Sequence, residues 1–271
     1  MNILHAVILG ALQGICEFLP ISSSGHLVLL QKIFGIEGHL FFNTMLHAGT
    51  LLAVVAVLWN DIWKIIKRPI QPITGFLVLA TIPIVIAALV FKKPIEQAFE
   101  TGRYLGFCFL FTSALLIFAE LRSKRTASII KKDSKMKILD AIVIGIMQAI
   151  AIAPGISRSG ATISGALACK LDRGFAARFS FLLSIPAILG ALVLDLFKGS
   201  ISGASANGTE NGIISIAAIA AGTVTAALVG FFAVKFMLKI IKEKSLYGFA
   251  VYTAVLGIFI LIDQFGTHFV F

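Results

Sequence analysis

Charged residues, cysteine and proline are all scarce in this chain of 271 residues. Asp, Glu, Lys and Arg together make up 13% of it, while hydrophobic residues make up 58%. An ordinary soluble domain has about 25% charged and 45–50% apolar residues, so this composition excludes a soluble enzyme. With 24 Gly and only 7 Pro, a disordered or collagen-like chain is excluded too. Three cysteines without paired spacing argue against a disulfide framework or a zinc site.

Acidic residues are outnumbered by basic ones, 13 to 23, and the net charge is +10. In a soluble chain this surplus would indicate nucleic acid binding. In a chain so apolar, the excess of Lys and Arg in cytoplasmic loops explains it better, and we expect no nucleic acid partner. The first 16 residues are apolar, but they lack a charged leader and a small-residue cleavage site. They are therefore expected to be structure rather than a signal peptide.

Six apolar runs are long enough to cross a bilayer, for which about 20 residues are needed. They are residues 40–59, 73–91, 104–121, 179–197, 213–236 and 246–262. The linker 122–137 carries seven Lys or Arg and marks the cytoplasmic side, whereas loop 198–212 carries one Lys and is expected outside. The sequence thus predicts a multi-pass membrane protein in a lipid bilayer.

Counting the spans between these loops requires two segments that enter and leave the membrane on the same side. Residues 138–178 contain two apolar arms, about 138–153 and 161–171, too short to span and joined by PGISRSG. Residues 1–39 form the second such segment, with EFLPISSSGH at its joint. Short arms around a polar, Gly-rich joint are typical of a re-entrant helical hairpin, which is tolerated where protein or a wet cavity surrounds it.

The two joints resemble each other at a fixed offset of 135 residues. The matching pairs are Gly10 and Gly145, Gln13 and Gln148, Ser22 and Ser157, Ser24 and Ser159, and Gly25 and Gly160. One hairpin plus three spans make up each half, 1–121 and 138–271, on either side of the linker. Three is odd, so the halves have opposite orientations. We predict a single all-α integral membrane domain of six transmembrane helices and two re-entrant hairpins, arranged as an inverted repeat.

Polar side chains at membrane depth are costly and point to function. The candidates are Gln13, Glu17, Ser22, Ser23, Ser24 and His26 in the first hairpin, and Gln148, Ser157, Arg158, Ser159 and Thr162 in the second. An Arg fork with hydroxyls and Gly-exposed N–H groups at a helix N-terminus suits a phosphate. The carboxylate and the histidine supply general acid–base groups or a metal ligand. Together they indicate phosphate chemistry inside a membrane.

Each candidate also has a purely structural explanation. Serines in membrane helices usually bond to a carbonyl or allow close packing. Glu17 and Arg158 can pair as a structural lock. His47 lies inside an expected span, and we take it as a packed or hydrogen-bonded residue rather than a ligand.

The strings LQGICEFLPISSSGHLVL and QAIAIAPGISRSGATISGA resemble the two signature motifs of the undecaprenyl-diphosphate phosphatase family of bacitracin-resistance proteins. The resemblance covers essentially the whole chain, including FFNTMLHAGTLLAV and FSFLLSIPAILGA. It implies a hydrolase in the bacterial cytoplasmic membrane, with its active site opening to the external side. Such an enzyme removes the terminal phosphate of the C55 isoprenoid diphosphate to recycle the carrier of cell-wall precursors, and bacitracin competes for this substrate.

Carried over by position, the resemblance puts the family's essential glutamate at Glu17, its nucleophilic serine at Ser23 and its histidine at His26. Its phosphate-binding loop falls on Ser157, Arg158, Ser159, Gly160 and Thr162, with Arg158 as a catalytic residue. Gln13, Ser22, Ser24, Gly25 and Gln148 are expected to contact the substrate phosphates. This chain departs from many members at two places: Gln13 replaces a second glutamate, and Tyr252 is followed by Thr253 instead of an Arg.

Several alternatives stay open at this stage. The attacking group is Ser23 or a water, and the proton passes to His26 or Glu17; in a further alternative, Glu17 holds a divalent cation, Mg²⁺ or Ca²⁺. No organic cofactor is expected, and a homodimer is left open. The rival function is a lipid-phosphate flippase, because inverted repeats with broken helices are typical of transporters. The type-2 acid phosphatases are excluded, since position 164, where they need a histidine, is Ser.

Overall fold

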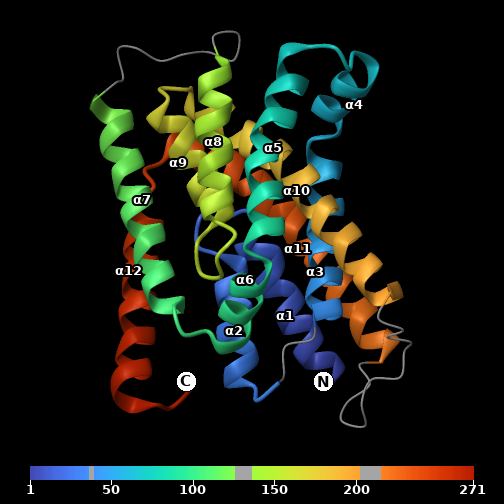
Figure 1. Cartoon of the computed structure of the whole chain (residues 1–271), viewed down its shortest axis with the longest axis vertical. Helices are drawn as coiled ribbons and strands as arrows, with labels where there is room; N and C mark the ends of the chain where they lie inside the picture. The colour runs from blue at the N-terminus through green and yellow to red at the C-terminus, as the bar shows by residue number, and fades with distance from the viewer. Residues whose placement is uncertain (37–39, 126–135, 202–214) are drawn as a thin grey trace.

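The computed structural model describes residues 1–36, 40–125, 136–201 and 215–271, and every regular element in these ranges is a helix. The helices are α1 (Ile3–Cys16), α2 (Ser23–Ile33), α3 (Leu40–Val57), α4 (Trp59–Lys67), α5 (Pro72–Val90), α6 (Lys92–Thr101), α7 (Leu105–Arg125), α8 (Ile138–Ile150), α9 (Arg158–Ala168), α10 (Arg173–Ile201), α11 (Ile216–Glu243) and α12 (Tyr247–Ile262), followed by a π-helical turn, η2 (Asp263–Thr267). They lie side by side, with both termini at one end of the bundle and α4 at the other (Figure 1).

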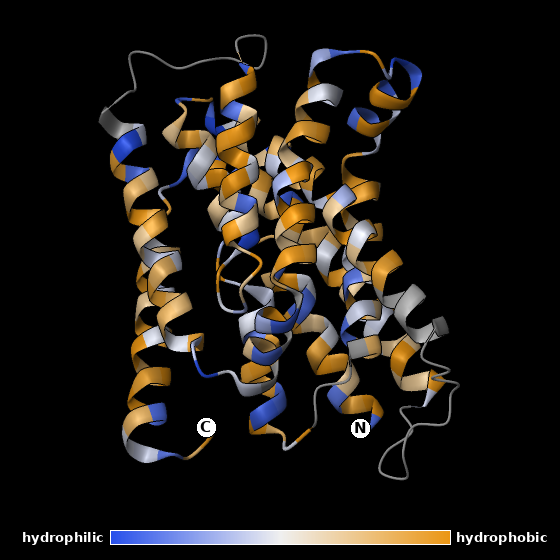
Figure 2. Cartoon of the chain, viewed as in Figure 1, coloured by the Kyte–Doolittle hydropathy of each residue, from blue (hydrophilic) through white to orange (hydrophobic). Residues whose placement is uncertain are grey.

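Five of the described helices are long and apolar enough to cross a membrane: α5, α7, α10, α11 and α12. A sixth span results if α3 is counted together with α4, which bends from it by 77°. Hydrophobic residues cover most of the long helices, and hydrophilic ones gather at the two ends of the bundle (Figure 2). The chain is therefore an all-helical protein with five to six candidate membrane spans.

Two pairs of shorter helices interrupt this series at the predicted hairpins. Helices α1 and α8 have 14 and 13 residues, about 20 Å at 1.5 Å per residue, against a hydrocarbon core of about 30 Å. The first joint, residues 17–22, is shorter than the sequence predicts, and the second, residues 151–157, has the predicted length but begins three residues earlier. The second arm of the second hairpin begins at Arg158 rather than at 161, so the serines and the arginine of the motifs lie in the first turns of α2 and α9.

Each hairpin packs its first helix against a long helix from the other half of the chain. Helix α1 lies along α11, and α8 lies along α5. The matched glycines permit both contacts: a Cβ atom on Gly10 would collide with the carbonyl oxygen of Gly222, and one on Gly145 would lie 2.7 Å from the carbonyl oxygen of Ala80. Close approach of backbones at small residues is how membrane helices commonly pack.

The segments 60–72 and 92–103, predicted as loops, contain helices α4 and α6. In α4, Asp61 lies in the first turn and Lys64 and Lys67 in the last, which complements the helix dipole. Trp59 and Trp63 stack with ring centroids 5.7 Å apart, as in an interfacial anchor. An amphipathic helix of nine residues has too few apolar positions to stand out in a search for spans, so it was missed. Residues 126–135 of the predicted basic linker and 202–212 of the predicted external loop lie outside the described residues.

Candidate functional site

The two hairpin joints contact each other inside the bundle. The Ser159 hydroxyl, in the first turn of α9, donates to the Leu19 carbonyl in the first joint at 3.0 Å. Reciprocally, a Cβ atom on Gly25 in the first turn of α2 would lie 3.0 Å from the Cα atom of Gly155 in the second joint. The N-terminal ends of α2 and α9 are thus brought together, and with them the polar residues of both motifs (Figure 1).

Glu17 is the centre of this polar cluster, and its side chain is only 3% exposed. The Ser23 hydroxyl donates to its Oε2 atom at 2.6 Å, and the Gln13 amide donates to the same oxygen at 2.8 Å. The Arg158 guanidinium donates to the other oxygen, Oε1, through Nη2. Its Nη1 donates to the Ser184 carbonyl at 3.3 Å. Three predicted site residues, Ser23, Gln13 and Arg158, therefore share one carboxylate.

The charges of this cluster balance in the absence of substrate. One carboxylate faces one guanidinium, and Arg158 keeps 18% of its side chain exposed. A buried carboxylate is tolerable at this depth because Arg158, Ser23 and Gln13 satisfy it. The guanidinium has five N–H donors, of which these contacts use two, so it can still accept a second anion.

The serines beside these residues cap the two helices in the same way. The Ser22 hydroxyl accepts from the Gly25 N–H at 3.2 Å, and the Ser157 hydroxyl accepts from the Gly160 N–H at 3.1 Å. In both cases the serine two residues further on lies close to the cap. The hydroxyl oxygens of Ser22 and Ser24 are 3.4 Å apart, and those of Ser157 and Ser159 are 3.2 Å apart. These caps fix two helix N-termini, which attract anions through their dipoles and free N–H groups.

Two further predicted residues, Gln148 and Thr162, make their bonds elsewhere. The Gln148 side chain is fully buried and donates to the Ala80 carbonyl of α5 at 3.4 Å. The Thr162 hydroxyl bonds to the Ser180 hydroxyl of α10 at 2.6 Å. Both residues hold the second hairpin against its neighbouring helices. None of the contacts described for them reaches Glu17.

His26 belongs to a different network from Glu17. Its Nδ1 atom lies 2.7 Å from the Ser22 carbonyl, which can only accept, so Nδ1 carries the proton. Its Nε2 atom lies 2.7 Å from the Tyr252 hydroxyl, and the two rings stack 5.6 Å apart. Both nitrogens are occupied, which suits a residue that holds Tyr252 at the site. Thr253 takes no part, because its hydroxyl bonds to carbonyls of its own helix.

Sequence reasoning left three contributors unassigned: His47, Ser184 and Tyr252. Nδ1 of His47 lies 2.9 Å from Nε2 of Gln13 and 3.4 Å from Oε2 of Glu17. The only signal for His47 was a titratable residue inside an apolar span. Ser184 contributes a backbone carbonyl and gives no signal, and Tyr252 reaches the site from a helix more than 200 residues away.

The protein ligands do not fit a resident divalent cation. Within the described ranges, no three residues of His, Cys, Asp or Glu gather in a way that could hold one. The Glu17 oxygens already accept from Arg158, Ser23 and Gln13, and the guanidinium beside them repels a cation. One oxygen, Oε1 of Gln13, is buried without a partner, but a single amide oxygen is far short of six ligands.

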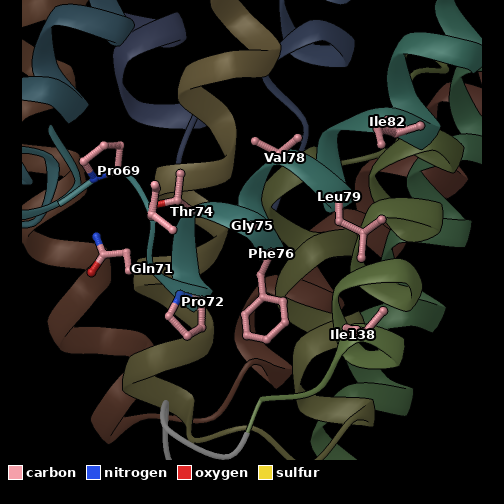
Figure 3. Close-up of a pocket in the computed structure, with 11 residues that line it drawn as sticks. Pro69, Gln71, Pro72, Thr74, Gly75, Phe76, Val78, Leu79, Ile82 and Ile138 are labelled. Carbon is pink, nitrogen blue, oxygen red and sulfur yellow. The ribbon is translucent and has the colours of Figure 1, made fainter.

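The cavity in Figure 3 lies apart from this cluster. It has a volume of about 770 Å³ and mostly apolar walls, formed by residues 69–82 of α5 and the preceding segment together with Ile138 at the start of α8. None of the predicted site residues lines it. The polar cluster around Glu17 is therefore the candidate site, and the cavity is an apolar recess near the end of the bundle that carries α4.

Comparisons with known proteins match nearly the whole chain. Residues 6–259 match the family model described as bacitracin resistance protein BacA. An undecaprenyl-diphosphatase of Carboxydothermus hydrogenoformans is 45% identical over 265 residues, which covers 97% of this chain and 98% of the relative. Undecaprenyl-diphosphatase 4 of Bacillus cereus is 44% identical over 269 residues, 98% of each chain. An undecaprenyl-diphosphatase of Methanosphaera stadtmanae is 38% identical over 284 aligned positions, 97% of this chain and 98% of the relative.

Proposed function

Because the chain belongs to the bacitracin resistance protein BacA family, we propose that it hydrolyses undecaprenyl diphosphate to undecaprenyl phosphate and inorganic phosphate. The reaction returns the lipid carrier to cell-wall synthesis and gives resistance to bacitracin, which competes for the same lipid diphosphate. The observation that carries this proposal is the Glu17 cluster, in which a hydroxyl, a carboxylate and a guanidinium meet at two helix N-termini.

The terminal phosphate binds between the N-termini of α2 and α9. Arg158 grips it through its planar fork, and the N–H groups of the first turns contribute partial positive charge. Ser22, Ser157 and Ser159 keep those turns in place through their caps and cross-contacts. The same donors stabilise the charge that the phosphoryl oxygens carry in the transition state.

Ser23 is the nucleophile and Glu17 its base. The hydroxyl already donates to Oε2 of Glu17 at 2.6 Å, within the reach required of a general base. The Oγ–P bond forms as the bond between phosphorus and the bridging oxygen breaks, and undecaprenyl phosphate leaves. Once Glu17 has given up that proton, to water or to the departing lipid phosphate, a water attacks the phosphoserine. The proton of this water passes through Glu17 to Oγ of Ser23 as the Oγ–P bond breaks, and phosphate is released.

The substrate itself makes Glu17 basic. Before binding, the guanidinium of Arg158 stabilises the Glu17 carboxylate in its charged form. When a phosphate shares the guanidinium of Arg158, the guanidinium stabilises the Glu17 carboxylate less, and Glu17 becomes a stronger proton acceptor. This order keeps Ser23 inactive until a phosphate is in place.

We propose that a divalent cation, Mg²⁺ or Ca²⁺, enters as part of the substrate complex. Mg²⁺ commonly binds through substrate phosphates, waters and one or two carboxylates rather than through a cage of protein ligands. A diphosphate supplies the oxygens that the residues around Glu17 lack. Ser23, Glu17 and Arg158 carry the steps given above, and the cation would neutralise part of the charge of the diphosphate.

The proposed fold completes this assignment with six spans, two re-entrant hairpins and opposite orientations of the two halves. The exchanged packing of α1 on α11 and α8 on α5 supports an inverted repeat. Lys64, Lys67 and Lys137 lie at the end of the bundle that carries α4, which supports a cytoplasmic position for that end and an external opening for the site. The isoprenoid tail lies in the bilayer, against the spans.

Phosphate release by the purified protein in detergent tests the proposal. Undecaprenyl diphosphate should be converted to undecaprenyl phosphate and phosphate in equal amounts. Transport across a membrane cannot be scored in detergent, so a protein that only flips the lipid releases no phosphate. That outcome would favour the flippase over the hydrolase. The names of the relatives favour the hydrolase.

A further inference from the structure

Among the described side chains in contact with the Glu17 carboxylate, His47 is a titratable group that the reaction described above does not use. It lies on α3, outside both hairpins, and its Nδ1 atom is 3.4 Å from Oε2 of Glu17. This is the same oxygen to which Ser23 donates. A third of the His47 side chain is exposed, whereas that of Glu17 is almost completely buried.

The Gln13 amide fixes the tautomer of His47. Its Nε2 group donates to Oε2 of Glu17 at 2.8 Å and lies 2.9 Å from Nδ1 of His47. Since an amide N–H only donates, Nδ1 of a neutral His47 must present its lone pair to Gln13 and carry its proton on Nε2. The lone pair is thereby held beside Glu17 while the N–H group is left on the other side of the ring.

A proton that Glu17 receives from Ser23 needs a way out. Glu17 is shielded from water, and Arg158 is already protonated and cannot accept. Both nitrogens of His26 are engaged, with the Ser22 carbonyl and Tyr252. Among the described neighbours of Glu17, His47 therefore combines an accepting lone pair, on Nδ1 beside Oε2, with a partly exposed ring.

We propose that His47 is a positioning residue that acts through Glu17, as the outlet for the proton of Ser23. As the Oγ–P bond forms, the Ser23 proton moves to Oε2 of Glu17 and then to Nδ1 of His47. The proton on Nε2 leaves from the exposed side to water or to the departing lipid phosphate. The Gln13 amide orients both Glu17 and His47. A glutamine at this position therefore has a function in the relay, although it is not a second carboxylate. This inference rests on the proposed phosphatase activity.

Two substitutions of His47 test the relay in the phosphate-release assay. His47→Asn keeps an acceptor for Gln13 but cannot take a proton, so kcat should fall at least about a hundredfold with KM unchanged. His47→Ala opens a space at an exposed position, and added imidazole should restore part of its lost rate. The matched control is His5→Asn, on α1, where the ring stacks on Phe34, 4.7 Å away; it should leave kcat and KM unchanged.

The outcomes separate the two proposals. A wild-type protein that releases no phosphate overturns the proposed function itself. An active wild type with a fully active His47→Asn variant overturns only the relay, as does a folded His47→Ala variant that imidazole fails to rescue. If the alanine variant does not fold, the kcat of the folded asparagine variant decides. A rise in KM with kcat intact also counts against the relay, because it indicates substrate binding alone.

Discussion

Ser23 and Arg158 occupy equivalent positions, 135 residues apart, as the first residues of α2 and α9, and both donate to the carboxylate of Glu17. Ser23 contacts Oε2 and Arg158 contacts Oε1. Two helix pairs with the same caps thus bring a hydroxyl from one half and a guanidinium from the other to one carboxylate. The similar sequences of the two halves place these two positions alike, and the different residues at them, Ser23 and Arg158, give the site a hydroxyl and a guanidinium.

Replacing Arg158 by Lys should reduce phosphate release by at least about a hundredfold, the scale seen when one transition-state donor is lost. A Lys ammonium keeps the charge but cannot bond to a phosphate, Glu17 and the Ser184 carbonyl from one planar fork. The rate with saturating lipid diphosphate measures the effect. Arg103→Lys, at the exposed turn before α7, is the matched control and should be fully active. Near-normal turnover by the Arg158 variant would show that charge alone suffices.

Replacing Glu17 by Gln should lower kcat at least about a hundredfold, because an amide cannot accept the Ser23 proton. The shape of the side chain hardly changes, so thermal unfolding separates chemistry from structure. If activity survives while the unfolding temperature drops sharply, Glu17 and Arg158 form a structural lock and the catalytic assignment is wrong. Glu243→Gln, at the exposed end of α11, should change neither property.

Local patterns predicted much of this arrangement. The S-x-x-G sequences at 22–25 and 157–160 are helix N-caps. Their repetition relates the two joints that the count of spans predicts. Glu17 and Arg158 were notable for being charged at membrane depth. These features depend on a few neighbouring residues, which is why a single sequence reveals them.

Such local patterns do not predict contacts between residues far apart in the sequence. His47 joins Glu17 because α3 packs near α1, and Tyr252 meets His26 because α12 packs along α7. Nothing in the sequence around positions 47 or 252 specifies these neighbours. The match of Gln148 with Gln13 predicts a phosphate contact, which stays a prediction; in the structure the Gln148 amide donates to the Ala80 carbonyl, because that end of α8 lies along α5.

A second buried ion pair, Arg173 with Glu120, should affect stability without affecting chemistry. The Arg173 guanidinium donates to Glu120 at 3.1 Å and to the carbonyls of Ile241 and Lys244 at 2.8 and 2.6 Å, which ties α10 to α7 and to the end of α11. Arg173→Lys loses some of these bonds, at about 2 kcal/mol. We expect the unfolding temperature to fall by about 5 °C with kcat per folded molecule unchanged. A large loss of kcat in the folded variant would place Arg173 in the catalytic machinery.

Removing divalent cations should slow phosphate release, and the cation requirement should follow the substrate. If the cation enters bound to the diphosphate, the concentration of free Mg²⁺ for half-maximal rate should fall as the lipid concentration is raised at fixed enzyme, because the complex then reaches KM at a lower occupancy of the lipid by metal. A half-maximal concentration that ignores the lipid but shifts in a Gln13→Ala variant would instead indicate a resident site, with the unpartnered Gln13 oxygen among its ligands. Chelator titrations at two lipid concentrations distinguish a cation carried by the diphosphate from a cation in a resident site.

Replacing Ser23 by Ala should abolish activity even at saturating cation, because the phosphoserine intermediate can no longer form. Rapid quenching of the wild-type enzyme with labelled lipid diphosphate should place the label on the peptide that contains residues 21–26. Within it, Ser22 and Ser24 are poor substitutes: the Ser22 hydroxyl accepts from the Gly25 N–H, and no bond to Glu17 is described for either, whereas Ser23 donates to Glu17 directly.

Ser245→Ala, in an exposed turn, should behave as wild type. A Ser23→Ala variant that keeps measurable turnover, together with an unlabelled wild type, would make a water the nucleophile. Label on Ser157 or Ser159 would move the nucleophile to the second hairpin.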